Sequence, residues 1–197
     1  MGPGRVVFFE CSTSFLTCSA PTQEAAEFSE ETLDNFIRSC AGYCVISFLL
    51  GIGDRHLENL MLTTSGCLFH IDFEYILGND PKPFAPPMRL SEQMVMAMGG
   101  RNSRHYLEFQ KFCCKAYLIL RKHARLFLNL LDLARDLNAT NSPLSFRSGQ
   151  ELVERFQLHL SPQEAVAYLQ EVIHQSLGAL FPHIVDTVHK WRQFFKA

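Results

Sequence analysis

A β-hairpin within an otherwise helical sequence is the feature that most limits how this chain can fold. Two short apolar runs, Leu60–Thr63 and Cys67–Ile71, are separated by three residues that end in Gly66. Short runs on either side of a glycine-containing turn predict two antiparallel strands. The sequence therefore predicts a small antiparallel element between longer helical regions.

Helices are predicted on both sides of this hairpin. Ser29 is placed as an N-cap, with acidic residues in the first turn, and this helix should end at Gly51. Further helices are predicted from Ser91 to Gly99, through Arg104–Leu137, from the capping box Ser161–Glu164 to Pro182, and on to the C-terminus, with a loop over Asn138–Ser148. The expected fold class is α+β, mainly α, with a short β-hairpin and a helical bundle.

Composition narrows the classes of function. Hydrophobic residues make up 47% of the 197 residues, which is enough for one domain with a real core. The formal net charge of −2 argues against a dedicated nucleic-acid binder, because such proteins are usually strongly basic. The seven cysteines are odd in number and irregularly spaced, so we expect reduced thiols and a cytoplasmic protein. No apolar run approaches the about 18 residues of a membrane span.

Polar side chains gather just before and just after the predicted hairpin. Asn59 and Asp72 stand at its two ends, so they can be adjacent in space. A carboxylate beside an amide oxygen suits Mg²⁺, which takes further ligands from substrate phosphates. Asp54 and His56 lie on the loop before the hairpin, where they can handle the proton of a nucleophilic hydroxyl. Protein kinases place a base, a metal ligand five residues later, and a second metal ligand in the same order for phosphoryl transfer.

The order of letters differs from that of protein kinases, which read His-Arg-Asp where this chain reads Asp54-Arg55-His56. In this inversion the chain resembles the phosphatidylinositol 3- and 4-kinase superfamily, and more narrowly the class III, vacuolar-sorting phosphatidylinositol 3-kinases. The resemblance is dense over residues 39–100 and looser from Ser161 to Trp191. It is carried by the segments Ser39–Ile46, Gly53–Asn59, Leu68–Phe73, Asp80–Pro83, Pro86–Leu90 and Met98–Gly100.

The resemblance implies a lipid kinase that uses ATP with Mg²⁺ or Mn²⁺ to phosphorylate the 3-hydroxyl of phosphatidylinositol. His56 would be the general base or proton handler, and Asp54 would orient the hydroxyl. Asn59 and Asp72 would hold the metal. Met61, Phe69 and Ile71 would form the lower wall of the adenine pocket, since alternate residues of a strand share one face.

The resemblance also implies a domain organisation, that of a protein-kinase-like C-terminal lobe. Residues 29–197 would form this lobe, and residues 1–28 would be an irregular N-terminal segment or the remnant of a missing N-terminal lobe. The functional segments would be the catalytic loop 53–59, the activation loop 72–90 and a C-terminal membrane helix 183–197.

Two departures from the family pattern bear on activity. Glu74 stands where the family usually has Gly, which tolerates backbone angles that Glu does not. No glycine-rich phosphate loop and no ATP-pairing lysine precede residue 30, so the chain is expected to be a fragment that is weak or inactive alone. Two alternatives stay open: a catalytically dead interaction module, and a 4-kinase or protein-kinase branch of the same superfamily.

The activation loop indicates the headgroup. Its only basic residues are Lys82 and Arg89, whereas a headgroup with extra phosphates would need several cations. Unphosphorylated phosphatidylinositol is therefore the expected substrate, with Lys82 on its phosphodiester and Arg89 as the weaker candidate, unless both are ordinary solvated charges. Family resemblance implies a scaffold pseudokinase and a beclin-like subunit as partners, on endosomal or autophagic membranes.

The C-terminal segment has an amphipathic pattern. Apolar residues at steps of three and four, among them Val188, Trp191 and Phe195, fall on one helical face, with Lys190 and Lys196 beside it. Aromatic residues flanked by cations suit an anionic bilayer surface. The alternative is a helix that packs on its own domain.

Overall fold

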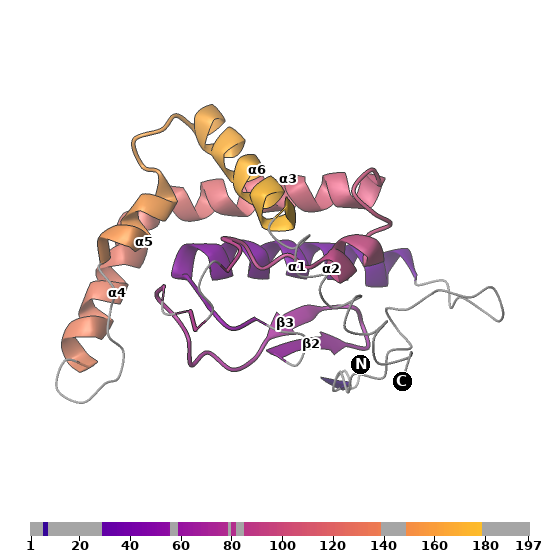
Figure 1. Ribbon diagram of the computed structural model, residues 1–197, viewed down its shortest axis with the longest axis horizontal. Helices are drawn as coiled ribbons and strands as arrows, with labels where there is room; N and C mark the ends of the chain where they lie inside the picture. The colour runs from indigo at the N-terminus through magenta and orange to yellow at the C-terminus, as the bar shows by residue number, and fades with distance from the viewer. Residues whose placement is uncertain are drawn as a thin grey trace, which may run out of the picture.

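The computed structural model describes residues 6–7, 29–55, 59–78, 80–81, 85–138 and 149–178. These residues form a layered arrangement in which α3 lies above α1 and a small sheet lies below it (Figure 1). The elements are β1 (Val6–Val7), α1 (Glu30–Leu50), β2 (Leu60–Thr63), β3 (Leu68–His70), α2 (Glu92–Ala97), α3 (Arg104–Lys122), α4 (Ala124–Asn138), α5 (Gly149–Phe156) and α6 (Pro162–Gly178). The prediction of a mainly helical α+β fold is confirmed.

Helix α1 begins and ends where the sequence predicts. The Ser29 side chain accepts a hydrogen bond from the backbone amide of Thr32, and Glu30 and Glu31 lie in the first turn. The helix ends at Gly51, which has φ 58° and donates its backbone amide to Phe48. A Cβ at position 51 would lie 2.6 Å from the amide nitrogen of Gly78, so glycine also permits the close approach of a distant segment.

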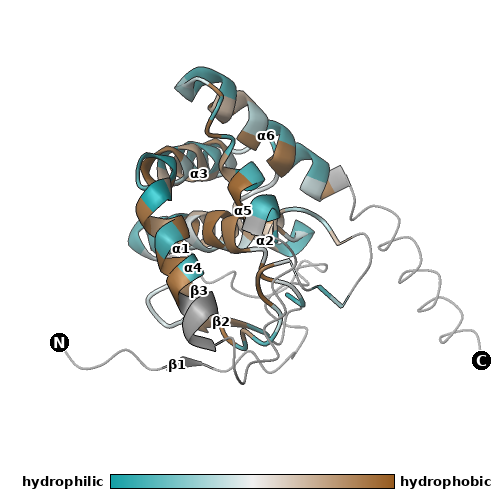
Figure 2. Cartoon of the chain, turned by 90° about the vertical axis from the view of Figure 1, so that its left-hand side faces the viewer, coloured by the Kyte–Doolittle hydropathy of each residue, from teal (hydrophilic) through white to brown (hydrophobic). Residues whose placement is uncertain are grey.

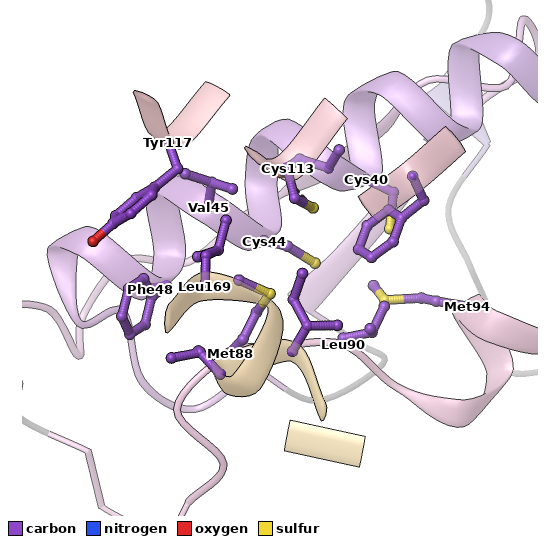
Figure 3. Packing of buried hydrophobic residues seen from close by; sticks show 14 of the residues in the cluster. Cys40, Cys44, Val45, Phe48, Met88, Leu90, Met94, Cys113, Tyr117 and Leu169 are labelled. Atoms are coloured by element: carbon purple, nitrogen blue, oxygen red, sulfur yellow. Dashed lines mark hydrogen bonds between the residues drawn. The ribbon is translucent and has the colours of Figure 1, made fainter. Parts of the chain in front are cut away.

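The core forms where α1 meets α3, α6 and the segment that leads into α2. Cys40, Cys44 and Val45 of α1 pack among side chains of these elements (Figure 3), which include Cys113, Tyr117, Leu169, Met88 and Leu90. By length and composition alone, helix α1 is long and apolar enough to cross a membrane. In this structure, however, its apolar side packs into the core. Helices α3 and α6 carry both hydrophilic and hydrophobic residues, as expected of helices that cover a core (Figure 2).

The hairpin has one face on α1 and one face turned away from it. Strands β2 and β3 are antiparallel, with Leu60 opposite His70 and Met61 opposite Phe69. Leu68 and Leu60 pack with the core, whereas Met61 is buried outside that cluster. Val6 and Val7 add β1 to the free edge of β2, although residues 1–28 were expected to be irregular. β-branched residues favour strands, and the rest of that segment lies outside the described residues.

The thiols behave as predicted within the described part of the chain, where all five cysteines are free. A hydrogen bond with Cys44, together with burial, raises the pKa of the Cys40 thiol, and burial raises the pKa of Cys113. Thiols with raised pKa values are poor nucleophiles and metal ligands. Cys40, Cys44 and Cys113 therefore serve as core residues.

The C-terminal helices differ from the prediction in two places. The stretch Arg104–Leu137 breaks at His123, which ends α3, and the chain turns there into α4 (Figure 1). Helix α5 was not predicted. It is held by Arg155, whose Nη1 donates to the carbonyl of Phe48, 2.6 Å away, in the last turn of α1. That turn has no basic residue of its own, so Arg155 supplies the cation that the helix dipole favours there.

The capping box that predicts α6 is present. The Glu164 side chain accepts from the Ser161 amide, and the Ser161 hydroxyl accepts from the Glu164 amide. The hydrogen bond from Ser161 lowers the pKa of the Glu164 carboxyl. Pro182 and the C-terminal helix predicted after it lie outside the described residues.

His70, where the hairpin packs against α1, makes the stability of the fold depend on pH. His70 is buried, its Nδ1 lies 3.2 Å from the Ser47 hydroxyl, and its ring lies 4.7 Å from that of Tyr43. Burial, with a smaller contribution from the charge of Arg55, lowers the pKa of His70 to about 4. In the unfolded chain His70 takes up a proton near pH 6.5, whereas in the folded protein it does so only near pH 4. The free energy of unfolding therefore falls as the pH drops from about 6.5 to about 4.

We expect the His70→Gln variant to lose less stability than the wild type on acidification, by about 3 kcal/mol between neutral pH and pH 4. Urea denaturation of both proteins at several pH values measures the difference. His174→Gln, on the exposed side of α6, is the matched control for loss of a histidine. Parallel pH profiles for wild type and His70→Gln would contradict a buried neutral imidazole.

Candidate active site

The loop that follows α1 and the segment that follows β3 are joined through their backbones. The Gly53 amide donates to the carbonyl of Tyr75 at 2.7 Å, and the Leu77 amide donates to that of Leu50 at 2.8 Å. A third bond, of 3.0 Å, runs from Gly78 to Gly51. These bonds fix the start of the predicted catalytic loop against the start of the predicted activation loop.

Asn59 and Asp72 lie across the open end of the hairpin. The Ile71 amide donates to the Asn59 carbonyl at 3.0 Å, so Asp72 follows directly after the residue that pairs with Asn59. The Asn59 side chain is buried, and its Nδ2 donates to the Asp54 carbonyl at 2.8 Å, which fixes the orientation of the amide. The Asp72 residue is exposed. The hairpin thus brings the predicted metal ligands to one place.

The chemistry of this donor set fits Mg²⁺. A carboxylate and an amide carbonyl offer hard oxygens, and Mg²⁺ commonly takes only one or two protein ligands and completes its shell with water and phosphate oxygens. Within the described ranges no three His, Cys, Asp or Glu side chains gather as a self-sufficient metal site. The two oxygen donors therefore suit a metal that arrives with a phosphate-bearing substrate.

Arg55 ties the two sides of the site together, and sequence reasoning assigned it no role. Its Nε donates to the Gly53 carbonyl at 2.9 Å, while Nη1 and Nη2 donate to the carbonyls of Ile71 and Asp72. The guanidinium also lies over the ring of Phe73, 5.4 Å from its centroid. Burial lowers the pKa of Arg55, and the neighbouring carboxylates of Asp72 and Asp54 oppose that shift.

Backbone strain is concentrated at the site. Asp54, Asp72 and Leu77 have positive φ angles of 47°, 57° and 61°. Such angles cost non-glycine residues about 1 kcal/mol or more each, and they persist where the surroundings impose them. Here the bonds made by Arg55 and the paired segments impose them.

Glu74 does not carry this strain. It is absent from the described non-glycine residues with positive φ, and its side chain is exposed. Its amide donates to Oδ1 of Asp72 at 3.3 Å. The backbone at position 74 therefore does not require the conformational freedom of glycine in this structure.

The residues predicted to contact adenine lie in β2, in β3 and directly after β3. Met61 and Phe69 are directly opposite each other across β2 and β3, on the face turned away from α1. Met61 is 5% exposed, and Phe69 and Ile71 are half-buried. The alternation along β3 follows the predicted pattern, with His70 pointing the other way into α1.

Three of the predicted site residues are not seen in a position to bind substrate. His56 and Lys82 lie outside the described residues. Arg89 lies in an ion pair with Asp80, and its Nε donates to the Ile52 carbonyl at 3.2 Å. Its guanidinium is thus engaged within the protein, and a contact with the lipid headgroup stays a prediction.

Sequence comparison identifies the family. Residues 10–142 match the phosphatidylinositol 3- and 4-kinase family, and this match covers more than half of the chain. The chain belongs to this family.

Curated relatives point to one type of enzyme within the family. The chain is 46% identical over 186 residues to phosphatidylinositol 3-kinase VPS34 of Arabidopsis thaliana, covering 93% of this chain and 23% of the relative. It is 48% identical over 165 residues to the root isoform of phosphatidylinositol 3-kinase of Glycine max, covering 83% and 20%. VPS34 of Saccharomyces cerevisiae is 46% identical over 165 residues, covering 83% and 19%. The resemblance read from the motifs is confirmed, and the chain spans about a fifth to a quarter of these relatives' length.

We expect Arg55→Lys to loosen the site without unfolding the domain, because an ammonium cannot bridge three carbonyls as a planar guanidinium does. Amide hydrogen exchange at Gly53, Leu77 and Gly78 should accelerate about tenfold or more. Arg101→Lys, which alters a half-buried ion pair with Glu92, is the matched control and should leave these amides unchanged. Unaltered exchange in Arg55→Lys would show that the backbone bonds alone hold the two segments.

Proposed function

We propose that this chain provides the C-terminal catalytic lobe of a phosphatidylinositol 3-kinase, which transfers the γ-phosphate of ATP to the 3-hydroxyl of phosphatidylinositol. The observation that carries the proposal is the placement of Asn59 and Asp72 across the open end of one hairpin, with Arg55 joining Asp72 to the catalytic loop. Similarity to the curated phosphatidylinositol 3-kinases supports the same reaction.

Each residue of the site has a role in this reaction. Asn59 and Asp72 would hold Mg²⁺, which when bound neutralises charge on the phosphates as the phosphoryl group is transferred. Asp54 and His56 would orient the inositol 3-hydroxyl and accept its proton, following the family pattern. Met61, Phe69 and Ile71 would contact adenine from below. Phosphoryl transfer depends mostly on such positioning, and the bonds of Arg55 to the backbone beside Asp54 and at Asp72 support these roles.

The substrate is proposed to be phosphatidylinositol without extra phosphates, since only Lys82 and Arg89 carry positive charge between residues 72 and 90. Lys82 would contact its phosphodiester. The enzyme would act as a peripheral protein on endosomal or autophagic membranes, with a scaffold pseudokinase and a beclin-like subunit as partners. Much of that assembly would depend on parts of the relatives that this chain does not span.

Asp72→Asn should lower phosphate transfer to phosphatidylinositol by about a hundredfold or more, because it removes the charge that holds the metal. The assay uses the longest polypeptide that the gene encodes, with phosphatidylinositol vesicles, ATP and Mg²⁺, and identifies the phosphorylated position on inositol. Glu74→Gln is the matched acid-to-amide control and should stay within about twofold of wild type.

The same assay separates the alternatives. Product phosphorylated at the 4-position, or phosphate found on protein, would assign another branch of the superfamily. Absence of transfer by the wild type, with its fold verified, would favour an interaction module.

The C-terminal segment 183–197 lies outside the described residues and is proposed to bind the membrane as an amphipathic helix. Removal of residues 190–197 from the same polypeptide should weaken liposome binding by about tenfold, because Trp191, Phe194 and Phe195 gain most at an interface. Vesicle co-sedimentation measures binding, and ATP hydrolysis without lipid should survive the truncation. Undiminished binding would instead support a helix that packs on its own domain.

A further inference from the structure

Asp80 and Arg89 form an ion pair within the activation loop 72–90. They stand at the two ends of residues 81–88, the Pro-rich part of that loop. The side chains are 16% and 14% exposed, which makes this pair less exposed than any other ion pair among the described residues. Ion pairs shielded from water are less screened than surface pairs and hold their geometry better.

The Asp80 end of the loop lies directly on the catalytic loop. A Cβ at position 53 would lie 2.9 Å from Cα of Asp80 and 3.0 Å from its Cγ, so the contact requires Gly53. The Asp80 amide donates to Gly78, whose own amide donates to Gly51. The beginning of the loop is therefore positioned relative to the residues that precede Asp54.

The Arg89 end is anchored in the core. The Cys44 thiol of α1 donates to the Arg89 carbonyl at 3.4 Å, and the Met88 amide donates to the hydroxyl of Ser176 in α6 at 2.9 Å. Arg89 Nε bonds the carbonyl of Ile52 at 3.2 Å, beside Gly53. Both ends of the loop thus meet at Ile52 and Gly53, and the ion pair joins one end to the other.

We infer that Asp80 and Arg89 are a positioning pair that joins the two ends of loop 81–88 and fixes these ends beside Ile52 and Gly53. Arg89 acts on the lipid through Asp80 and the loop, and it does not bind the headgroup itself. This inference rests on the proposed function, because the loop carries Lys82, the residue proposed to contact the headgroup. It replaces a direct role for Arg89 with an indirect one.

The inference has a kinetic consequence. A loop whose ends are already joined loses less conformational entropy when it binds a ligand. Loss of either charge should therefore raise KM for phosphatidylinositol more than KM for ATP. A direct Arg89 contact makes a different prediction, since removal of the Asp80 charge would then release the guanidinium and lower KM for the lipid.

The test compares Asp80→Asn, Arg89→Met, Arg89→Lys and the double variant Asp80→Asn with Arg89→Met, in the longest polypeptide the gene encodes. We expect both single charge losses to raise KM for phosphatidylinositol about fivefold, with the double variant no worse than either. Arg89→Lys keeps the charge but lacks the Nε that bonds the Ile52 carbonyl, so its KM for phosphatidylinositol should lie between those of the wild type and Arg89→Met. Arg101→Met and Glu92→Gln, which break a half-buried ion pair between the first residue of α2 and the turn after that helix, are the matched controls and should change neither KM.

A lowered or unchanged KM for phosphatidylinositol in Asp80→Asn would overturn the inference. Hydrogen exchange over residues 75–90 provides a readout that does not depend on lipid kinase activity. Exchange there should accelerate about tenfold in both single variants. If the wild type does not phosphorylate lipid, the proposed function fails while exchange still decides the positioning pair, and unchanged exchange in both variants would overturn it.

Discussion

The hydrogen bonds of one half-buried guanidinium hold the site together. Arg55 donates to carbonyls on both sides of the hairpin, at Gly53 before it and at Ile71 and Asp72 after it. Backbone carbonyls accept these bonds whatever the side chains at those positions, so the link fixes the main chain and leaves the carboxylate of Asp72 for chemistry. Arginine suits the task because its planar fork presents several donors in fixed directions, which a lysine cannot do. Removal of this residue would leave Asn59 bonded to Asp54 but would remove the side-chain bonds that tie Asp72 to the loop before the hairpin.

Helix α1 is the platform on which that link is built. Its core residues bind it to α3 and α6, its other side receives the hairpin through His70, and its last turn receives Arg155 from α5. The catalytic loop 53–59 begins two residues after Gly51, the C-cap of α1, so its start lies close to a helix that packs in the core. Among the described residues proposed to do chemistry, Asp54 and Asp72 lie outside helices and strands, and the segment that follows Asp72 is bonded to the last residue of α1 through Leu77. This arrangement reconciles a polar, exposed site with precise positions.

Local signals in the sequence predicted most of the helices and strands. The features that they could not predict depend on contacts between residues far apart in the sequence. Ser29, Gly66 and Ser161 act on neighbours within a few residues, so the starts of α1 and α6 and the hairpin turn could be identified directly. Helix α5 depends on the contact of Arg155 with Phe48, more than a hundred residues earlier, and no local pattern reports it. The roles of Arg55 and Asp80 were missed for the same reason, because their partners are known only once the hairpin and loop are folded. The backbone angle at Glu74 could not be predicted either, since it depends on how the segment after β3 pairs with the loop after α1.

The strained residues show how the stability of the core is used at the site. Asp54, Asp72 and Leu77 all take left-handed angles, each at or beside a bond that joins the segment after β3 to the end of α1 or to the loop that follows it. Such angles are unfavourable for an isolated chain. They persist only where distorting the surrounding structure would cost more free energy than relaxing the backbone would gain. The backbone bonds at Gly53, Leu77 and Gly78, the three donors of Arg55 and the Asp80–Arg89 pair together provide that surrounding structure. The backbone of Asp72 is thereby held at the open end of the hairpin, and its carboxylate starts from a fixed point on the main chain.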